Sequence, residues 1–128
     1  MTELNYRMTS TGPIEPGVYE VKIVRDFRDR EKQGTGDHLQ MTLEIVAGKH
    51  AGRKIFDWLE LWSSHDQKRD RAIAKLETIL EAIGIREVAD SRQLHNIVIG
   101  ARVIWLDKFR AGRDPFFFVE QYCSRDQV

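Results

Sequence analysis

Aromatic and apolar side chains alternate along residues 53–62, RKIFDWLELW, and this segment is the best candidate in the chain for a binding surface. In a strand, successive side chains point to opposite faces. One face would be apolar with a single acid and would consist of Ile55, Asp57, Leu59 and Leu61. The other face would carry Lys54, Phe56, Trp58, Glu60 and Trp62. Flat rings beside positive charge suit unpaired nucleobases if that face is exposed. Alternatively, a short strand inside a small barrel buries both faces.

Residues that could perform catalysis show no comparable pattern. The four histidines are scattered, and no metal-ligand spacing, phosphate-binding loop or nucleophile motif is present. Gly34–Gly36 is too short for a phosphate cradle and predicts a turn. A nuclease cluster drawn from Asp57, Glu60 and Asp66 is an alternative that no other feature supports. We expect Asp57 to accept backbone hydrogen bonds near a turn, because an unpaired buried carboxylate is costly, and we expect no enzyme activity, cofactor or metal.

The hydrophobic pattern predicts five strands and one long helix. The strands are expected over residues 18–25, 38–46, 53–62, 97–106 and 116–123. The second strand alternates most clearly, with Leu39, Met41, Leu43 and Ile45 on one face and His38, Gln40, Thr42 and Glu44 on the other. The helix is expected to begin after the polar run 63–66 and to end at Gly84. Its apolar stripe would consist of Ala72, Ile73, Leu76, Ile79, Leu80 and Ile83.

This element order predicts a mainly β protein, an OB-fold-like five-stranded Greek-key barrel with one α-helix between strands 3 and 4. The alternative is an unrelated small α+β sheet covered by one helix. We expect a flexible N-terminal arm over residues 1–17, a single domain over residues 18–123 and a short tail over residues 124–128. Residues 26–37 are expected to form a loop, and residues 90–95 a short helical turn.

Two basic connections would flank the ligand groove of such a barrel, which lies on strands 2 and 3. One carries Arg28, Arg30 and Lys32, and the other carries Lys108, Arg110 and Arg113. Both also contain acids, so ordinary solvated loops are the alternative. If the groove binds nucleic acid, the expected stacking residues are Phe56, Trp58 and Trp62. The expected phosphate contacts are Arg28, Arg53, Lys54, Lys108, Arg110 and Arg113.

Composition restricts the class of protein further. The 128 residues include 20 basic and 20 acidic side chains, so any nucleic-acid site must be a local feature of a neutral protein. The only cysteine, Cys123, cannot form an internal disulfide, which is typical of a cytoplasmic protein. The sequence contains no apolar run of membrane-spanning length and no signal-peptide pattern, so no membrane association is expected.

Several segments resemble a group of small bacteriophage proteins classified as a phage domain of unknown function. These segments are Pro16–Val21, Gly34–Gly36, Leu39–Ile45, Gly48–Leu61 and Ile79–Gly84. Members of this group are encoded among replication and recombination genes and are regarded as OB-fold single-stranded DNA-binding proteins. The resemblance implies that Lys54, Phe56 and Trp58 lie near DNA. It also implies a phage recombinase or nuclease as a partner.

We therefore expect a non-catalytic, sequence-tolerant single-stranded DNA-binding protein of phage replication or recombination, located in the host cytoplasm. The alternative is a protein–protein interaction module that uses the same aromatic face. Such a module would form a homo-oligomer or regulate a phage or host enzyme, since aromatic residues with arginine are also common at protein interfaces.

Overall fold

A computed structural model of the chain describes residues 2–3, 14–31, 34–107 and 116–128. Its elements, in chain order, are β1 (Gly17–Arg30), β2 (Asp37–Ile45), β3 (Lys54–Leu59), α1 (Asp66–Ile83), η1 (Ser91–Leu94), β4 (Ile99–Asp107), β5 (Phe116–Cys123) and η2 (Arg125–Gln127). The predicted element order, helix end, short turn and last strand are confirmed.

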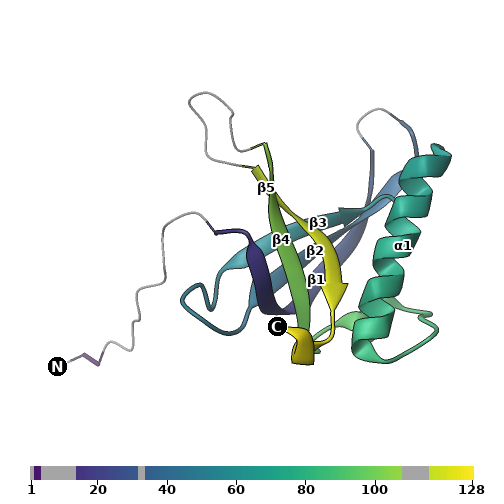
Figure 1. Cartoon of the computed structure of the whole chain (residues 1–128). Coiled ribbons are helices and arrows are strands. Elements are labelled where there is room, and N and C mark those ends of the chain that lie inside the picture. The colour runs from purple at the N-terminus through teal and green to yellow at the C-terminus, as the bar shows by residue number, and fades with distance from the viewer. Residues whose placement is uncertain (1, 4–13, 32–33, 108–115) are drawn as a thin grey trace.

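The five strands form one antiparallel sheet in the order β3-β2-β1-β4-β5. The prediction of a mainly β protein with a single long helix between the third and fourth strands is therefore confirmed. The β4–β5 pair crosses in front of β1, β2 and β3 in Figure 1, and α1 stands beside the sheet. This helix contacts both β3 and β5, the two edge strands.

Alternating side chains of the strands fill the core, as the period-two pattern predicts. In β2, the predicted inward set is buried, and in β3 the buried residues are Ile55, Asp57 and Leu59. Helix α1 adds Ala72 and Ile79 to the core and ends at Gly84, whose φ of 91° is left-handed. Ile73 was predicted to belong to the buried stripe, but it is 40 % exposed.

Strand β1 is longer than predicted. Residues 26–30 continue the strand and pair with β2, so the prediction of a loop over 26–37 is wrong for these residues. The pairing register shifts between Ile23 and Arg25, which marks a β-bulge. Because side chains alternate, this one-residue shift reverses the two faces for the rest of the strand.

The turn between β1 and β2 is tied to the connection between β3 and α1. The backbone N–H of Glu31 donates to the carbonyl of Gly36 at 2.9 Å, and the N–H of Ser64 donates to the carbonyl of Thr35 at 2.7 Å. At Gly36, where φ is 121°, a Cβ would lie 2.1 Å from the carbonyl oxygen of Trp62. Only glycine allows this close approach.

Strand β3 ends at Leu59, three residues earlier than predicted, and the chain turns at Leu61 and Trp62. Part of the predicted N-terminal arm packs against the domain, and its last residue, Gly17, begins β1. Ile14 is 1 % exposed, and Glu15 contacts Lys49 at 2.5 Å and His50 at 2.7 Å.

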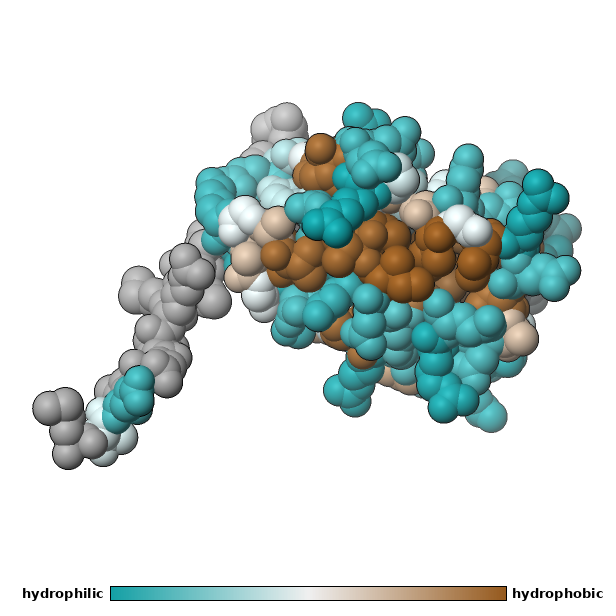
Figure 2. Space-filling view, turned by 90° about the horizontal axis from the view of Figure 1, so that it is seen from below, coloured by the Kyte–Doolittle hydropathy of each residue, from teal (hydrophilic) through white to brown (hydrophobic). Residues whose placement is uncertain are grey.

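The lower end of the molecule in Figure 1 carries η2, the C-terminal end of α1 and the segment that follows it. Figure 2, seen from this end, shows a band of hydrophobic side chains bordered by polar ones. Ile97 and Val128, which belong to segments at this end, are among the exposed large hydrophobic residues. Within the described ranges, no helix is long and apolar enough to cross a membrane.

Candidate nucleic-acid interface

The outer face of β1, β2 and β3 carries an aromatic surface, which we define by Phe27, Phe56 and Trp58. Phe27 pairs with Gln40, which pairs in turn with Trp58, so these three residues form one row across the sheet. Residues directly opposite each other in antiparallel strands lie on the same face. The next row runs from Arg25 through Thr42 to Phe56.

All three rings of the aromatic surface are accessible. Phe27 is 43 % exposed, Phe56 46 % and Trp58 44 %, whereas the intervening side chains of β3 are buried. The predicted assignment of the two faces of residues 54–59 is therefore confirmed, and the alternative in which both faces are buried does not hold. Exposed rings on one sheet face are available for stacking.

Basic side chains border the aromatic surface. The Lys54 ammonium lies 2.7 Å from the Glu44 carboxylate, and Lys22 reaches the same acid at 3.6 Å. The hydrogen bond from Lys54 is the main reason why the pKa of Glu44 is lowered. Arg25 lies between these groups and Phe27 and forms no ion pair with another described residue.

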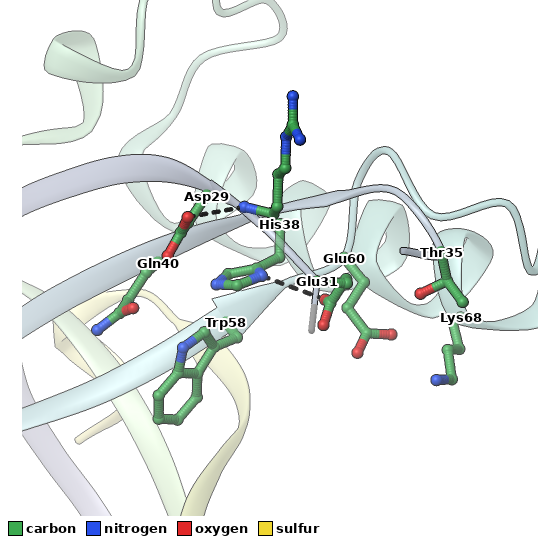
Figure 3. A pocket seen from close by; sticks show the side chains of 9 residues that line it. Asp29, Glu31, Thr35, His38, Gln40, Trp58, Glu60 and Lys68 are labelled. Atoms are coloured by element: carbon green, nitrogen blue, oxygen red, sulfur yellow. Dashed lines mark hydrogen bonds and ion pairs between the residues drawn. The ribbon is translucent and has the colours of Figure 1, made fainter. Parts of the chain in front are cut away.

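A hollow of about 610 Å³ opens beside Trp58, at the end of the aromatic surface (Figure 3). It lies between the β1–β2 turn, β2, the end of β3 and α1. Its lining residues are Asp29, Arg30, Glu31, Thr35, His38, Gln40, Trp58, Glu60 and Lys68. The hollow therefore combines one aromatic wall, two cations and several hydrogen-bond acceptors.

His38 is the most unusual residue of this hollow. It is only 9 % exposed, and its Nδ1 lies 3.2 Å from a carboxylate oxygen of Glu31. Neither ring nitrogen has a hydrogen-bond partner among the described residues. Buried polar atoms are normally paired, so the His38 ring has an unused bonding capacity.

Two residues predicted to join the site lie away from the aromatic surface. Arg28 follows the bulge and pairs with Leu39, a residue of the buried face. Its guanidinium stacks over the Trp62 ring at 3.8 Å and is bonded to Asp37 at 2.7 Å. Trp62 therefore stacks on Arg28 beside a separate hollow formed by η1, α1 and the inner side of the sheet.

The remaining predicted phosphate contacts divide into two groups. Arg53 lies just before β3, and its guanidinium is 3.2 Å from Nδ1 of His50, a buried ring beside Glu15. Lys108, Arg110 and Arg113 lie outside the described residues. Of the predicted set, the structure brings together Lys54, Phe56 and Trp58.

Asp57 holds the edges of the sheet and the helix together. Its carboxylate accepts hydrogen bonds from Lys75 of α1 at 2.8 Å, from the Tyr122 hydroxyl of β5 at 2.7 Å and from the Trp58 N–H at 2.9 Å. Burial raises the pKa of Asp57, and its three donors oppose that effect. Burial, and then the charge of Asp57, raise the pKa of Tyr122 well above 10. The predicted structural role of Asp57 rests mainly on side-chain donors, in addition to the predicted backbone contact.

The sequence prediction missed Phe27 and Arg25, because both faces of β1 depend on the bulge. It placed His38 and Gln40 on the polar face of β2 but did not assign them to a site. The signal available for these two residues was that they share the polar face of the strand that precedes the aromatic strand. No group of three or more potential metal ligands is arranged to hold an ion within the part of the chain that the structure describes.

The fold and the site define a small antiparallel β domain with a single helix and an exposed aromatic sheet face. Residues 3–103 match the family described as "Protein of unknown function (DUF669)", and the chain belongs to this family. The expectation that the chain belongs to a family of unknown function is therefore confirmed. A search of the curated proteins found no match.

Proposed function

We propose that this protein is a non-catalytic single-stranded DNA-binding protein that uses the outer face of β1, β2 and β3. The observation that carries the proposal is the exposure of Phe27, Phe56 and Trp58 on the same sheet face. Stacking on an aromatic side chain contributes about 1–3 kcal/mol per base and tolerates any sequence. Two or three stacked bases would therefore outweigh several screened surface charges.

The strand arrangement supports an OB-fold as the framework of this function. In that fold, the surface of strands 2 and 3 binds oligonucleotides. Here β1 lies between β2 and β4, the helix connects β3 to β4, and the edge strands β3 and β5 also contact each other. Phe56 and Trp58 of the aromatic surface lie on β3, one of the two strands that an OB-fold uses for binding.

Phosphate groups would follow the cations that border the rings. Arg25, Lys54, Arg30 and Lys68 surround the aromatic surface and its hollow. A strand of DNA stacked on Phe56 and Trp58 would bring its phosphates within reach of these side chains. We propose a role in phage DNA replication or recombination in the host cytoplasm, with a phage recombinase or nuclease as a protein partner.

Titration of intrinsic tryptophan fluorescence with oligo-dT and with a duplex of equal length tests the proposal. We expect quenching by the single strand only. Trp58→Ala should weaken binding by roughly 5- to 100-fold, which corresponds to one lost stacking contact. Trp62→Ala is the matched control, because Trp62 lies away from the aromatic surface. This variant should bind the single strand with an affinity within about twofold of the native protein.

Failure of oligo-dT to bind the folded protein would contradict single-strand binding. In that case, the sedimentation or light-scattering mass of the native protein and of Trp58→Ala would test the alternative. Dissociation of an oligomer in the variant would identify the aromatic surface as a protein interface.

A further inference from the structure

The hollow beside Trp58 has a chemistry that simple stacking does not require. Its walls hold the carboxylates of Asp29, Glu31 and Glu60, together with the ring of His38. Carboxylates repel phosphates, so phosphate groups would approach the two cations of the hollow, Arg30 and Lys68, and not its acidic walls. The acidic walls are suited to the edge of a base, which carries hydrogen-bond donors.

The position of His38 defines the bonding character of its free nitrogen. The Glu31 carboxylate lies 3.2 Å from Nδ1 without a hydrogen bond, and its negative charge favours the tautomer of the uncharged ring that carries the proton on Nδ1. Nε2 is then an acceptor, and it has no hydrogen-bond partner among the described residues. Figure 3 shows the His38 ring pointing between Glu31 and Trp58, with Gln40 beside it.

The aromatic wall and the acceptors are positioned for one base. Gln40 lies directly opposite Trp58 in the β2–β3 register, and His38 is two residues away on the same face of β2. A base stacked on Trp58 at the edge of the hollow would present its polar edge to His38 and Gln40. The volume of about 610 Å³ is within the range of roughly 300–1,000 Å³ typical of small-molecule sites.

We infer that this hollow is a base-reading subsite that prefers a base with an exocyclic amino group, on the basis of the proposed single-strand binding. Cytosine, adenine and guanine each offer an amino donor to the His38 Nε2 acceptor or to a carboxylate. Uracil and thymine present a carbonyl oxygen at the equivalent position, and this oxygen would face His38 Nε2 or a carboxylate, neither of which can donate a hydrogen bond to it. The protein therefore binds single strands generally but discriminates at one position.

Competition between oligo-dC and oligo-dU tests this inference most directly. The two pyrimidines have the same size and differ in the groups at positions 3 and 4, without the methyl group of thymine. At pH 8, where cytosine is uncharged, the native protein should prefer oligo-dC by about 5- to 10-fold, a discrimination expected from one good base-edge contact.

Two variants locate the preference. His38→Phe retains an aromatic ring and removes the nitrogen acceptor, and it should reduce the preference to less than about twofold. Glu60→Gln changes a second acceptor near the rim and should reduce the preference in part. His65→Ala is the matched histidine control, because His65 is exposed before α1 and its side chain makes no capping hydrogen bond.

The outcomes distinguish failure of the subsite from failure of the proposed function. Equal binding of the two oligonucleotides, or a preference for oligo-dU, would overturn the subsite and leave single-strand binding intact. A full oligo-dC preference in His38→Phe would overturn the role of His38. Absence of binding to both oligonucleotides would overturn the proposed function and the subsite together. A circular dichroism melt confirms that each variant is folded.

Discussion

Among single residues, Asp57 is expected to contribute strongly to stability, because one buried carboxylate joins β3 to both α1 and β5. Asp57 and Lys75 side chains are 3 % and 12 % exposed. A buried ion pair contributes little compared with an apolar pair of the same shape, but loss of one partner leaves the other charge buried and unpaired.

Asp57→Ala should therefore lower the free energy of unfolding by about 3–5 kcal/mol. Urea denaturation followed by circular dichroism measures this loss. Asp66→Ala is the control, because Asp66 pairs with Arg69 at 2.8 Å on the helix surface. Exposed pairs contribute at most about 1 kcal/mol. Similar losses in the two variants would contradict the structural role of Asp57.

Glu15 gives the protein an acid-sensitive contact. Hydrogen bonds with Lys49 and then His50 lower the pKa of Glu15 from 4.5 to about 2. A carboxyl group whose pKa is lower in the folded protein stabilises it above pH 4.5, and this contribution is lost as the pH falls toward 2.

Glu15→Gln should consequently reduce stability at pH 6, and its difference from the native protein should shrink as the pH falls from 4.5 to 3. Urea midpoints at these pH values give the comparison. A difference that stays constant with pH would show that the Glu15 charge does not contribute.

At the scale of elements, the β1–β2 turn depends on contact with the β3–α1 connection. Gly36→Ala should lower stability by more than about 3 kcal/mol, because its Cβ would clash with the Trp62 backbone and its φ is unfavourable for alanine. Gly34→Ala should cost only about 1–2 kcal/mol, since φ is 69° but the surrounding space is open. Thermal melts of the two variants measure the difference, and equal melting temperatures would contradict the contact.

The elements that the sequence predicted correctly are those in which side-chain burial follows one period without interruption. The faces of β2 and of β3 up to Leu59 follow directly from alternation. Phe27 could not be assigned in this way, because uninterrupted alternation from Val21 and Ile23 would have pointed it inward. Trp62 was assigned to the wrong surface because the chain turns after Leu59, a change that depends on contacts with distant residues.

At the scale of the whole molecule, equal numbers of acidic and basic residues make binding depend on local charge. If the four cations that surround the aromatic surface and its hollow each neutralise one phosphate, the logarithm of affinity should fall with the logarithm of salt concentration with a slope of about −3. Fluorescence titrations between roughly 50 and 200 mM salt measure this slope.

Arg25→Gln should make the slope shallower by about 0.7, the value expected for one phosphate contact with a single strand. Arg86→Gln is the control, because Arg86 follows α1, lines a separate hollow with Glu77 and Glu81, and should leave the slope unchanged. An affinity that does not respond to salt would contradict phosphate binding by this surface.

The bulge between Ile23 and Arg25 divides β1 into two halves that present apolar side chains to opposite faces. Val21 and Ile23 face the core, whereas Phe27 faces outward because Val24 adds one residue to the strand. Deletion of Val24 would remove this extra residue and leave Arg25 and Phe27 on the outer face, because Arg25 would then alternate directly with Ile23. Within this family, the first strand should therefore tolerate a one-residue difference in length at this position without loss of the aromatic surface.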